Sequence, residues 1–254
     1  MAKFPNVASV FENHPIKRTA MHQYDSKLPL ISLHIPKCGG TSFTEVLRSW
    51  FWPSFHAHYI AHDRGGVLPP YPHPVKSLLH KSRIKPMVIH GHFEDEADIF
   101  DYYPKAEQFI TVLRDPLEMQ LSLFWDHKRR LKEFGTLYWK GEEVEMEYGG
   151  DIDRWVAERP FYLMPFLPFN LTLENFKDEL SKRFVHIGVV EELQASVNHL
   201  ASRLGKQPVA IPKLNESQRD QLPSEGSIDA FRGKCELEYA IYNWALDLNT
   251  NPLP

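Results

Sequence analysis

The sequence predicts an α/β fold of three layers, in which helices flank a central, mostly parallel sheet. Short apolar runs typical of buried strands alternate along the chain with segments of helical periodicity. The chain has 254 residues, enough to bury a sizeable core. We expect an irregular lead-in over residues 1–27 and a single domain over residues 28–254.

Four strands are expected from short apolar runs that end at a residue breaking regular structure. Pro36 follows the first run, Gly91 the second and the triplet Arg114-Asp115-Pro116 the third. The predicted strands are 28–35, 87–90, 108–113 and 184–189. Each is of a length typical of strands.

The helices are expected between and after these strands. Thr41 or Ser42 can cap a first helix, and Pro116 suits the first turn of another that runs to about residue 132. Further helices are expected over 75–82, 151–158, 191–204 and 228–248. We expect a long loop over 53–74, a mobile segment over 135–150 and a packed loop over 161–169.

The composition limits which partners and which cellular compartment we expect for this protein. Hydrophobic residues make up 43% of the chain, charged residues 24%, and the net charge is -4. These values indicate a globular protein without a nucleic-acid partner, so any anion site must be local. Cys38 and Cys235 form no disulfide framework, and neither a signal core nor an apolar run long enough for a membrane span is present. We therefore expect a cytoplasmic protein with no membrane span, and we leave a homo-oligomer open.

Residues 36–43, Pro-Lys-Cys-Gly-Gly-Thr-Ser-Phe, lie where the first strand should give way to a helix. In open α/β sheets ligands bind at this edge, and a helix start offers unpaired amides and a positive dipole end. Gly39 and Gly40 would let a phosphate approach the backbone, Lys37 adds a charge, and Thr41 and Ser42 add hydroxyl groups. This is a P-loop-like anion site, or else a tight turn with an incidental lysine.

The order of residues in this loop excludes the common nucleotide-hydrolase motif, because Lys37 precedes the glycines. Residues 35–43 resemble the 5′-phosphosulfate loop of sulfotransferases that use 3′-phosphoadenosine-5′-phosphosulfate (PAPS). They are most similar to the carbohydrate branch that includes heparan sulfate 2-O-sulfotransferase. The resemblance implies that Lys37, Cys38, Gly39, Gly40, Thr41, Ser42 and Phe43 bind the donor. The family often has Thr or a small residue in place of Cys38, so we do not interpret Cys38 as a nucleophile.

A second phosphate motif is expected at residues 112–122. Arg114 ends a strand and Ser122 follows about two turns into the next helix, so both can hold a phosphate. The segment resembles the family's 3′-phosphate motif, which implies that role for Arg114 and Ser122. The family commonly has an arginine where this chain has Met119. Residues 187–193 resemble a later family segment that begins Gly-Val-x-Glu.

The sequence His90-Gly91-His92 closes the second predicted strand, between the two phosphate motifs. Imidazoles near an anion site are suited to proton transfer near neutral pH, although a lone histidine is more often structural. The resemblance implies that His92 is the catalytic base and His90 a supporting residue. Glu94 is the second candidate for the base.

The expected reaction is in-line transfer of a sulfuryl group from PAPS to an acceptor hydroxyl on a carbohydrate or another molecule, with PAP as product and no metal required. Lys37 would stabilise the departing nucleotide. The alternatives are a non-catalytic PAP- or glycan-binding protein of the same fold, and a phosphoryl-transfer enzyme. Animal relatives are Golgi-anchored, so the Golgi lumen is expected only if the chain is a trimmed piece.

Two further features can be interpreted either as structural or as functional. Histidines in the predicted loop and just beyond it match no standard zinc spacing, so we expect this region to contribute to acceptor binding instead. They are His56, His58, His62, His73 and His80. Lys128, Arg129 and Arg130 form either a solvated helix face or a site for an acidic acceptor.

Overall fold

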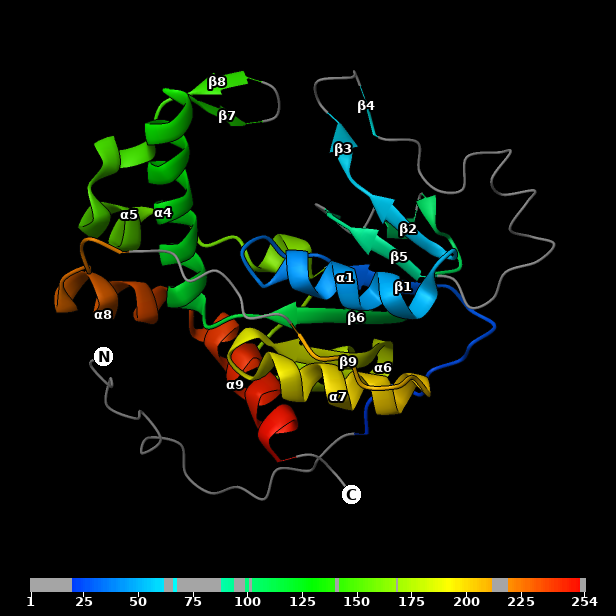
Figure 1. The fold of residues 1–254 in the computed structure, drawn as a ribbon. Helices are drawn as coiled ribbons and strands as arrows, with labels where there is room; N and C mark the ends of the chain where they lie inside the picture. The colour runs from blue at the N-terminus through cyan, green and yellow to red at the C-terminus, as the bar shows by residue number, and fades with distance from the viewer. Residues whose placement is uncertain are drawn as a thin grey trace.

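The computed structural model describes residues 20–61, 66–67, 88–93, 99–100, 102–139, 142–167, 169–211 and 219–251. Its centre is a five-stranded parallel sheet in the order β2-β5-β1-β6-β9 (Figure 1). The strands are β1 (Leu30–Leu33), β2 (Phe55–His58), β5 (Val88–Gly91), β6 (Gln108–Leu113) and β9 (Phe184–Val189). The predicted fold class is therefore confirmed.

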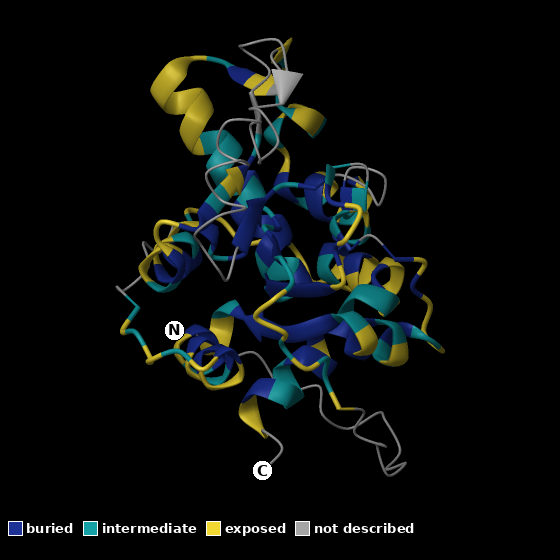
Figure 2. Cartoon of the chain, turned by 90° about the vertical axis from the view of Figure 1, so that its right-hand side faces the viewer, coloured by how far each residue is buried: buried dark blue, intermediate teal, exposed yellow. Residues whose placement is uncertain are grey.

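Helices cover both faces of this sheet. Because side chains alternate along a strand, Leu30 packs into one core cluster and Ile31 into another. The cluster of Leu30 is completed by α1 and α7, and that of Ile31 by α6 and α9. The bounds are α1 (Gly40–Phe51), α6 (Phe176–Arg183), α7 (Leu193–Leu204) and α9 (Glu236–Thr250). Figure 2 accordingly shows buried strands between helices with exposed outer faces.

A third core cluster joins the helices beside the sheet. Trp155 and Phe231, both fully buried, pack there with Phe124. The helices are α4 (Pro116–Phe134), α5 (Ile152–Glu158) and α8 (Glu225–Lys234). Helix α4 begins as predicted, since Asp115 caps it by accepting from the amide of Glu118 and Pro116 occupies its first turn. The packing of this cluster holds α4 in place next to the end of β6.

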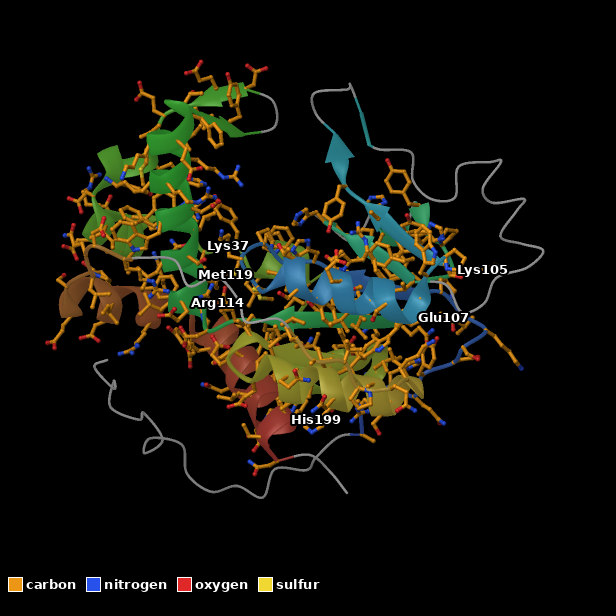
Figure 3. All side chains as sticks on the ribbon, in the orientation of Figure 1. Lys37, Lys105, Glu107, Arg114, Met119 and His199 are labelled. Carbon is orange, nitrogen blue, oxygen red and sulfur yellow. The ribbon has the colours of Figure 1, made fainter. Side chains whose placement is uncertain are left out.

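The parallel strands bring the predicted motifs to one edge of the sheet. Leu33, Gly91 and Leu113 end β1, β5 and β6, and β1 lies between β5 and β6 in the sheet. The segments that follow them contain the loop before α1, His92 and Arg114. In Figure 3, Lys37, Met119 and Arg114 lie together at this edge, whereas Lys105 and Glu107 lie at the opposite one.

Several predicted boundaries were wrong. The segment 53–74, expected to be a loop, contains the edge strand β2 and the short antiparallel pair β3 (Ile60–Ala61) and β4 (Gly66–Val67). Strand β2 exists because it pairs with β5, not because its Phe-His-Ala-His sequence is apolar. The predicted helix over 75–82 lies outside the described residues.

The C-terminal half also differs from the prediction. The segment 135–150, expected to be mobile, contains a hairpin of β7 (Leu137–Trp139) and β8 (Glu142–Val144), and the 3₁₀ turn η2 (Glu147–Gly150). Helix α6 was missed, and the single helix expected over 228–248 is divided at Cys235 into α8 and α9. The short 3₁₀ turns η3 (Met164–Phe166) and η4 (Val190–Glu192) complete the fold.

Within the described part of the chain, no helix combines the length and apolarity needed to cross a bilayer.

Gly91 permits the close pairing at the functional edge. A Cβ at this position would lie 1.7 Å from the carbonyl oxygen of His58, whereas one at Gly226 in α8 would meet nothing within 4 Å. We expect Gly91→Ala to lower the free energy of unfolding by about 1–3 kcal/mol or more, because strand β2 must move. Gly226→Ala should raise it by up to about 1 kcal/mol through helix propensity. Urea unfolding of both variants tests this, and a shift of the same sign in both would contradict it.

Candidate active site

The loop between β1 and α1 has the backbone geometry of an anion site. Lys37 and Gly39 have positive φ angles of 66° and 70°, and Cys38 between them does not. Alternation of this kind turns successive amides towards one point, as in anion-binding nests. Gly39 is the N-cap of α1 and provides no side-chain hydrogen bond, so the prediction that Thr41 or Ser42 caps the helix was wrong. The first amides of α1 are thus left for a ligand.

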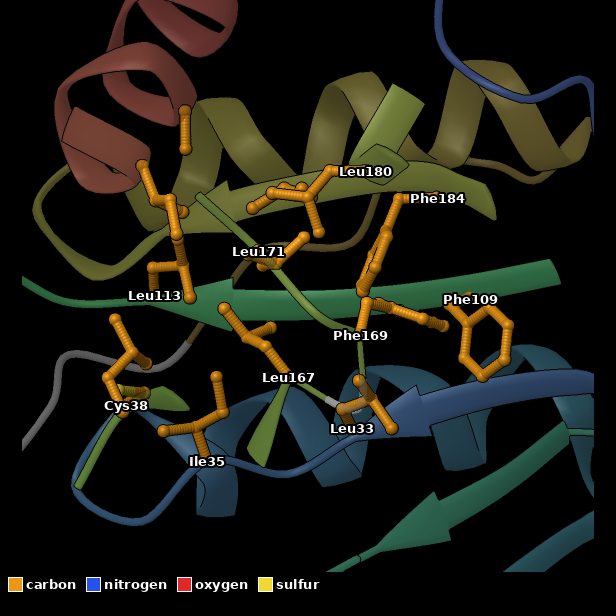
Figure 4. Packing of buried hydrophobic residues seen from close by; sticks show 14 of the residues in the cluster. Leu33, Ile35, Cys38, Phe109, Leu113, Leu167, Phe169, Leu171, Leu180 and Phe184 are labelled. Carbon is orange, nitrogen blue, oxygen red and sulfur yellow. The ribbon is translucent and has the colours of Figure 1, made fainter. Parts of the chain in front are cut away.

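The side chains of the loop divide between the core and the site. Cys38 and Phe43 are buried in separate hydrophobic clusters, and their backbone amides donate to the carbonyl oxygens of Ile35 and Gly39 at 3.3 and 3.2 Å, so their side chains do not reach a ligand. Ser42 is buried and Thr41 is exposed. Figure 4 shows Cys38 in the same core as Ile35 and Leu167. Burial raises the pKa of the Cys38 thiol far above its ordinary value, which agrees with a packing role.

The two positions at which the chain departs from the sulfotransferase pattern contact each other. The Sγ atom of Cys38 lies 3.8 Å from Sδ of Met119, and both side chains are buried. Met119 therefore fills the core beneath the loop instead of reaching a ligand. An arginine there would place a charge against Cys38, so the two departures are matched by packing.

Arg114 joins the two predicted phosphate motifs. Its NH1 atom donates to the carbonyl oxygen of Lys37 at 3.2 Å, and its NH2 atom lies 3.4 Å from Oε2 of Glu118. Its Nε atom is buried and has no hydrogen-bond partner among the described residues. A buried donor without a partner costs about 1–3 kcal/mol, and an anionic ligand would supply the missing acceptor.

Glu118 is shared by two arginines. Arg219 donates to Oε1 of Glu118 at 3.0 Å and to Oε2 at 2.5 Å, in addition to the contact from Arg114. The hydrogen bonds from Arg219 and the charges of both arginines lower the pKa of Glu118, although burial opposes this. Arg219 is thereby anchored beside the predicted 3′-phosphate residue.

Lys37, in the loop before α1, pairs with Asp126 of α4, the helix that also contains Glu118. Its Nζ atom lies 3.5 Å from Oδ1 of Asp126, which also binds Arg129 and Arg130. Burial lowers the pKa of Lys37, and the pairing with Asp126 counteracts that shift. Ser122 is buried and occurs four residues from both Glu118 and Asp126, so it lies on the helix face that Arg114 and Lys37 contact.

The end of β9 is tied to the same region. Oε1 of Glu191 accepts a hydrogen bond from the backbone amide of Asp115 at 3.1 Å. Burial raises the pKa of Glu191 and also that of Asp115. The contact fixes the start of α4 against η4, behind Arg114.

His90 is a structural link rather than an accessible group. Its side chain is fully buried; its Nδ1 atom lies 2.9 Å from Oγ of Ser32, and its Nε2 atom 3.0 Å from Oγ1 of Thr44. The Thr44 hydroxyl donates its hydrogen to the carbonyl oxygen of Gly40, so it can only accept from His90. The Nε2 atom of His90 therefore carries the proton. Burial holds the pKa of His90 well below its ordinary value. The neutral ring therefore connects β1, β5 and α1.

His92 lies just beyond β5, where its half-buried ring is surrounded by aromatic groups. It stacks on His34 with ring centroids 4.5 Å apart, is T-shaped to Tyr59 at 5.1 Å and is tilted against Phe166 at 6.4 Å. This arrangement places an imidazole beside the α1 loop without burying it completely. Glu94, the other candidate for the base, lies outside the described residues.

The structure bears on the two features that the sequence left open, the basic run at residues 128–130 and the histidines considered as zinc ligands. Arg129 and Arg130 pair with Asp126, and Arg129 also pairs with Glu133, so these charges are satisfied within α4. Among the candidate zinc ligands, His58 is buried against Tyr103, and His62, His73 and His80 lie outside the described residues. The described parts of the chain contain no group of three or more His, Cys, Asp or Glu that could hold a metal.

Three residues of this region were missed by the sequence analysis. His34 precedes the phosphate motif by two residues, but its nearest histidines in the sequence are His22 and His56, so no local pattern indicates its ring stacking. Asp126 follows Ser122 by four residues, so helical spacing gave a signal. Arg219 lies about 100 residues from its partner Glu118, and nothing in the local sequence indicates the contact.

Comparison with known proteins gives a distant structural likeness. No protein-family model matches the chain, and no curated protein matches it either. Among solved structures, the chain is similar to mouse sulfotransferase SULT7A1 complexed with PAP, with 13% sequence identity and a TM-score of 0.41. The likeness covers 79% of this chain and 63% of that one, less than two thirds of its length. A likeness this distant assigns no function.

The neutral histidines of this edge make stability dependent on pH. Burial lowers the pKa of His34 and of His58 to about 4, with a further contribution from His92 at His34. An unfolded chain takes up these protons near pH 6.5, so the part of the free energy of unfolding that these two rings contribute should fall as the pH drops from 6.5 to 4 and should change no further below pH 4. Each group contributes a slope of about 1.4 kcal/mol per pH unit at most.

We expect a double variant, His34→Ala with His58→Ala, to be less stable at pH 7 but to lose less stability on acidification. Urea unfolding at a series of pH values between 7 and 4 measures the slope. Equal slopes in the variant and the wild type would contradict the assignment of these rings as neutral.

Proposed function

We propose that this chain is a sulfotransferase that moves a sulfuryl group from PAPS to an acceptor hydroxyl, with PAP as product. One observation carries the proposal: Arg114 donates to the carbonyl of Lys37, so the two segments predicted to bind phosphates are in direct contact. A nucleotide with phosphates on both the 3′ and 5′ positions requires two such sites. The resemblance of both motifs to sulfotransferase sequences supports the same donor.

The roles of the binding residues follow from their positions. The amides at the start of α1, the Lys37 ammonium and the Ser42 hydroxyl would hold the 5′-phosphosulfate. Arg114 and Ser122 would hold the 3′-phosphate, and the buried Nε atom of Arg114 has no other partner among the described residues. No metal is needed for this arrangement, because the charges of the donor are met by side chains and amides.

In the proposed reaction, the acceptor hydroxyl attacks sulfur while His92 takes its proton. The new O–S bond forms as the bond between sulfur and the bridging phosphate oxygen breaks, and PAP leaves with that electron pair. Lys37 stabilises the charge that develops on the leaving oxygen. His90 supports the site by linking β1, β5 and α1. The carbohydrate acceptor is proposed from the sequence resemblance alone.

The proposed 3′-phosphate contact predicts a specific loss of discrimination. Wild-type protein should bind PAP more tightly than AMP, which lacks the 3′-phosphate. In Arg114→Ala, PAP binding should weaken at least about tenfold, because a charge-assisted contact is lost, whereas AMP binding should weaken less, through loss of the hydrogen bond to the Lys37 carbonyl alone. Calorimetric titration of both nucleotides measures this.

Arg154→Ala is the matched control, because Arg154 is an exposed arginine on α5 that pairs with Glu158. It should leave both affinities unchanged. Equal weakening of PAP and AMP in Arg114→Ala would argue against a 3′-phosphate role. Tighter magnesium-dependent binding of ATP than of PAP by the wild type would favour phosphoryl transfer instead.

The proposed chemistry predicts separate defects in two variants. His92→Ala should lower kcat by about 10²-fold or more, since a positioned base contributes that much, with little change in PAP affinity. Lys37→Ala should lower kcat by about 10²–10³-fold and also weaken PAP binding. Transfer of labelled sulfate from PAPS to a panel of sugars measures this. A wild type that binds PAP but transfers to none of them would support a non-catalytic binding protein.

A further inference from the structure

His34, the residue that follows β1, lies in a stack of histidine rings. Its centroid is 4.5 Å from that of His92 at an interplanar angle of 18°, and 5.0 Å from that of His90 at 17°. His34 thus lies face to face with the imidazoles of both His90 and His92. No function considered so far has used it.

The orientation of the His34 ring is fixed on two sides. Its Nδ1 atom lies 2.9 Å from the hydroxyl of Tyr59, whose own ring meets the edge of His92. A Cβ at Gly40 would lie 1.6 Å from Nε2 of His34, so the ring occupies the space that a side chain at the start of α1 would need. His34 therefore fills the space between the first residue of the phosphate-binding helix and His92.

The charges around His34 favour its neutral form. Burial and the neighbouring His92 lower its pKa to about 4. The titratable groups that face it are His90, His92 and the Tyr59 hydroxyl, and Arg48 of α1 acts on His90 from the other side. A neutral ring can lie against His92 when His92 takes up a proton, whereas a charged one would repel it.

We propose that His34 is a positioning residue that holds His92 at a fixed distance and orientation from the start of α1, and that Tyr59 in turn orients His34. The inference rests on the proposed function, in which α1 binds the donor and His92 accepts the proton. In-line transfer depends on the distance between the donor bound at α1 and the His92 ring, and a displacement of about 1 Å can lower a rate by about 10²-fold.

The experiment compares His34→Ala with a milder variant and a matched control. Tyr59→Phe removes only the hydroxyl that orients His34. His186→Ala is the control, because His186 is also a buried histidine in contact with another histidine ring, that of His199 at 6.4 Å, but it lies on β9, which β1 and β6 separate from β5. NMR titration of labelled histidine rings gives the pKa of His92 in each variant, and PAP affinity and kcat are measured in parallel.

In His34→Ala, the pKa of His92 should rise, because water reaches the uncovered face and solvates the charged ring. Its kcat should fall at least about tenfold with PAP affinity changed less than about twofold. Tyr59→Phe should show both changes in smaller measure, and His186→Ala neither. An unchanged His92 pKa in His34→Ala and Tyr59→Phe, or an equal change in His186→Ala, would overturn the proposal.

The two proposals fail in different ways. A wild type without sulfuryl transfer would refute the proposed function, while the NMR titration would still decide whether His34 controls the His92 ring. An active wild type whose His34→Ala variant keeps its kcat would refute the positioning role alone. If His34→Ala does not fold, the Tyr59→Phe titration decides the question.

Discussion

The candidate site depends on the hydrogen bond from the Arg114 guanidinium to the carbonyl oxygen of Lys37. These residues follow β6 and β1, which are neighbouring parallel strands, so the sheet itself brings them together. Lys37 adopts a left-handed conformation that costs a residue with a side chain about 1–3 kcal/mol. The bond to its carbonyl helps to hold that conformation, and with it the amides at the start of α1.

Helix α4 provides the acids that keep both cations in place. Asp126 pairs with Lys37, and Glu118 pairs with Arg114 and Arg219, while the buried Ser122 lies between the two acids on the helix. The cations are thus oriented before a ligand arrives, which reduces the ordering that binding requires. A phosphate would have to share or displace these carboxylates. The local balance of charge also explains how an anion site can occur in a chain whose net charge is -4.

The sequence predicted those parts of the fold that depend on local pattern. Strands β6 and β9 were placed correctly because their residues are almost all apolar, and the start of α4 because Pro116 suits the first turn of a helix. Strand β2 and the pair Glu118–Arg219 could not be predicted, since both depend on contacts between distant segments. His34 was missed for the same reason: its role depends on ring stacking across two strands.

Amide hydrogen exchange with and without PAP tests the central claim most directly, because it locates the phosphates on the backbone. The account predicts that PAP slows exchange at residues 38–42 and around Arg114, and that ATP does so less. Saturating PAP that protects neither segment, or protects a different edge of the sheet, would contradict the account.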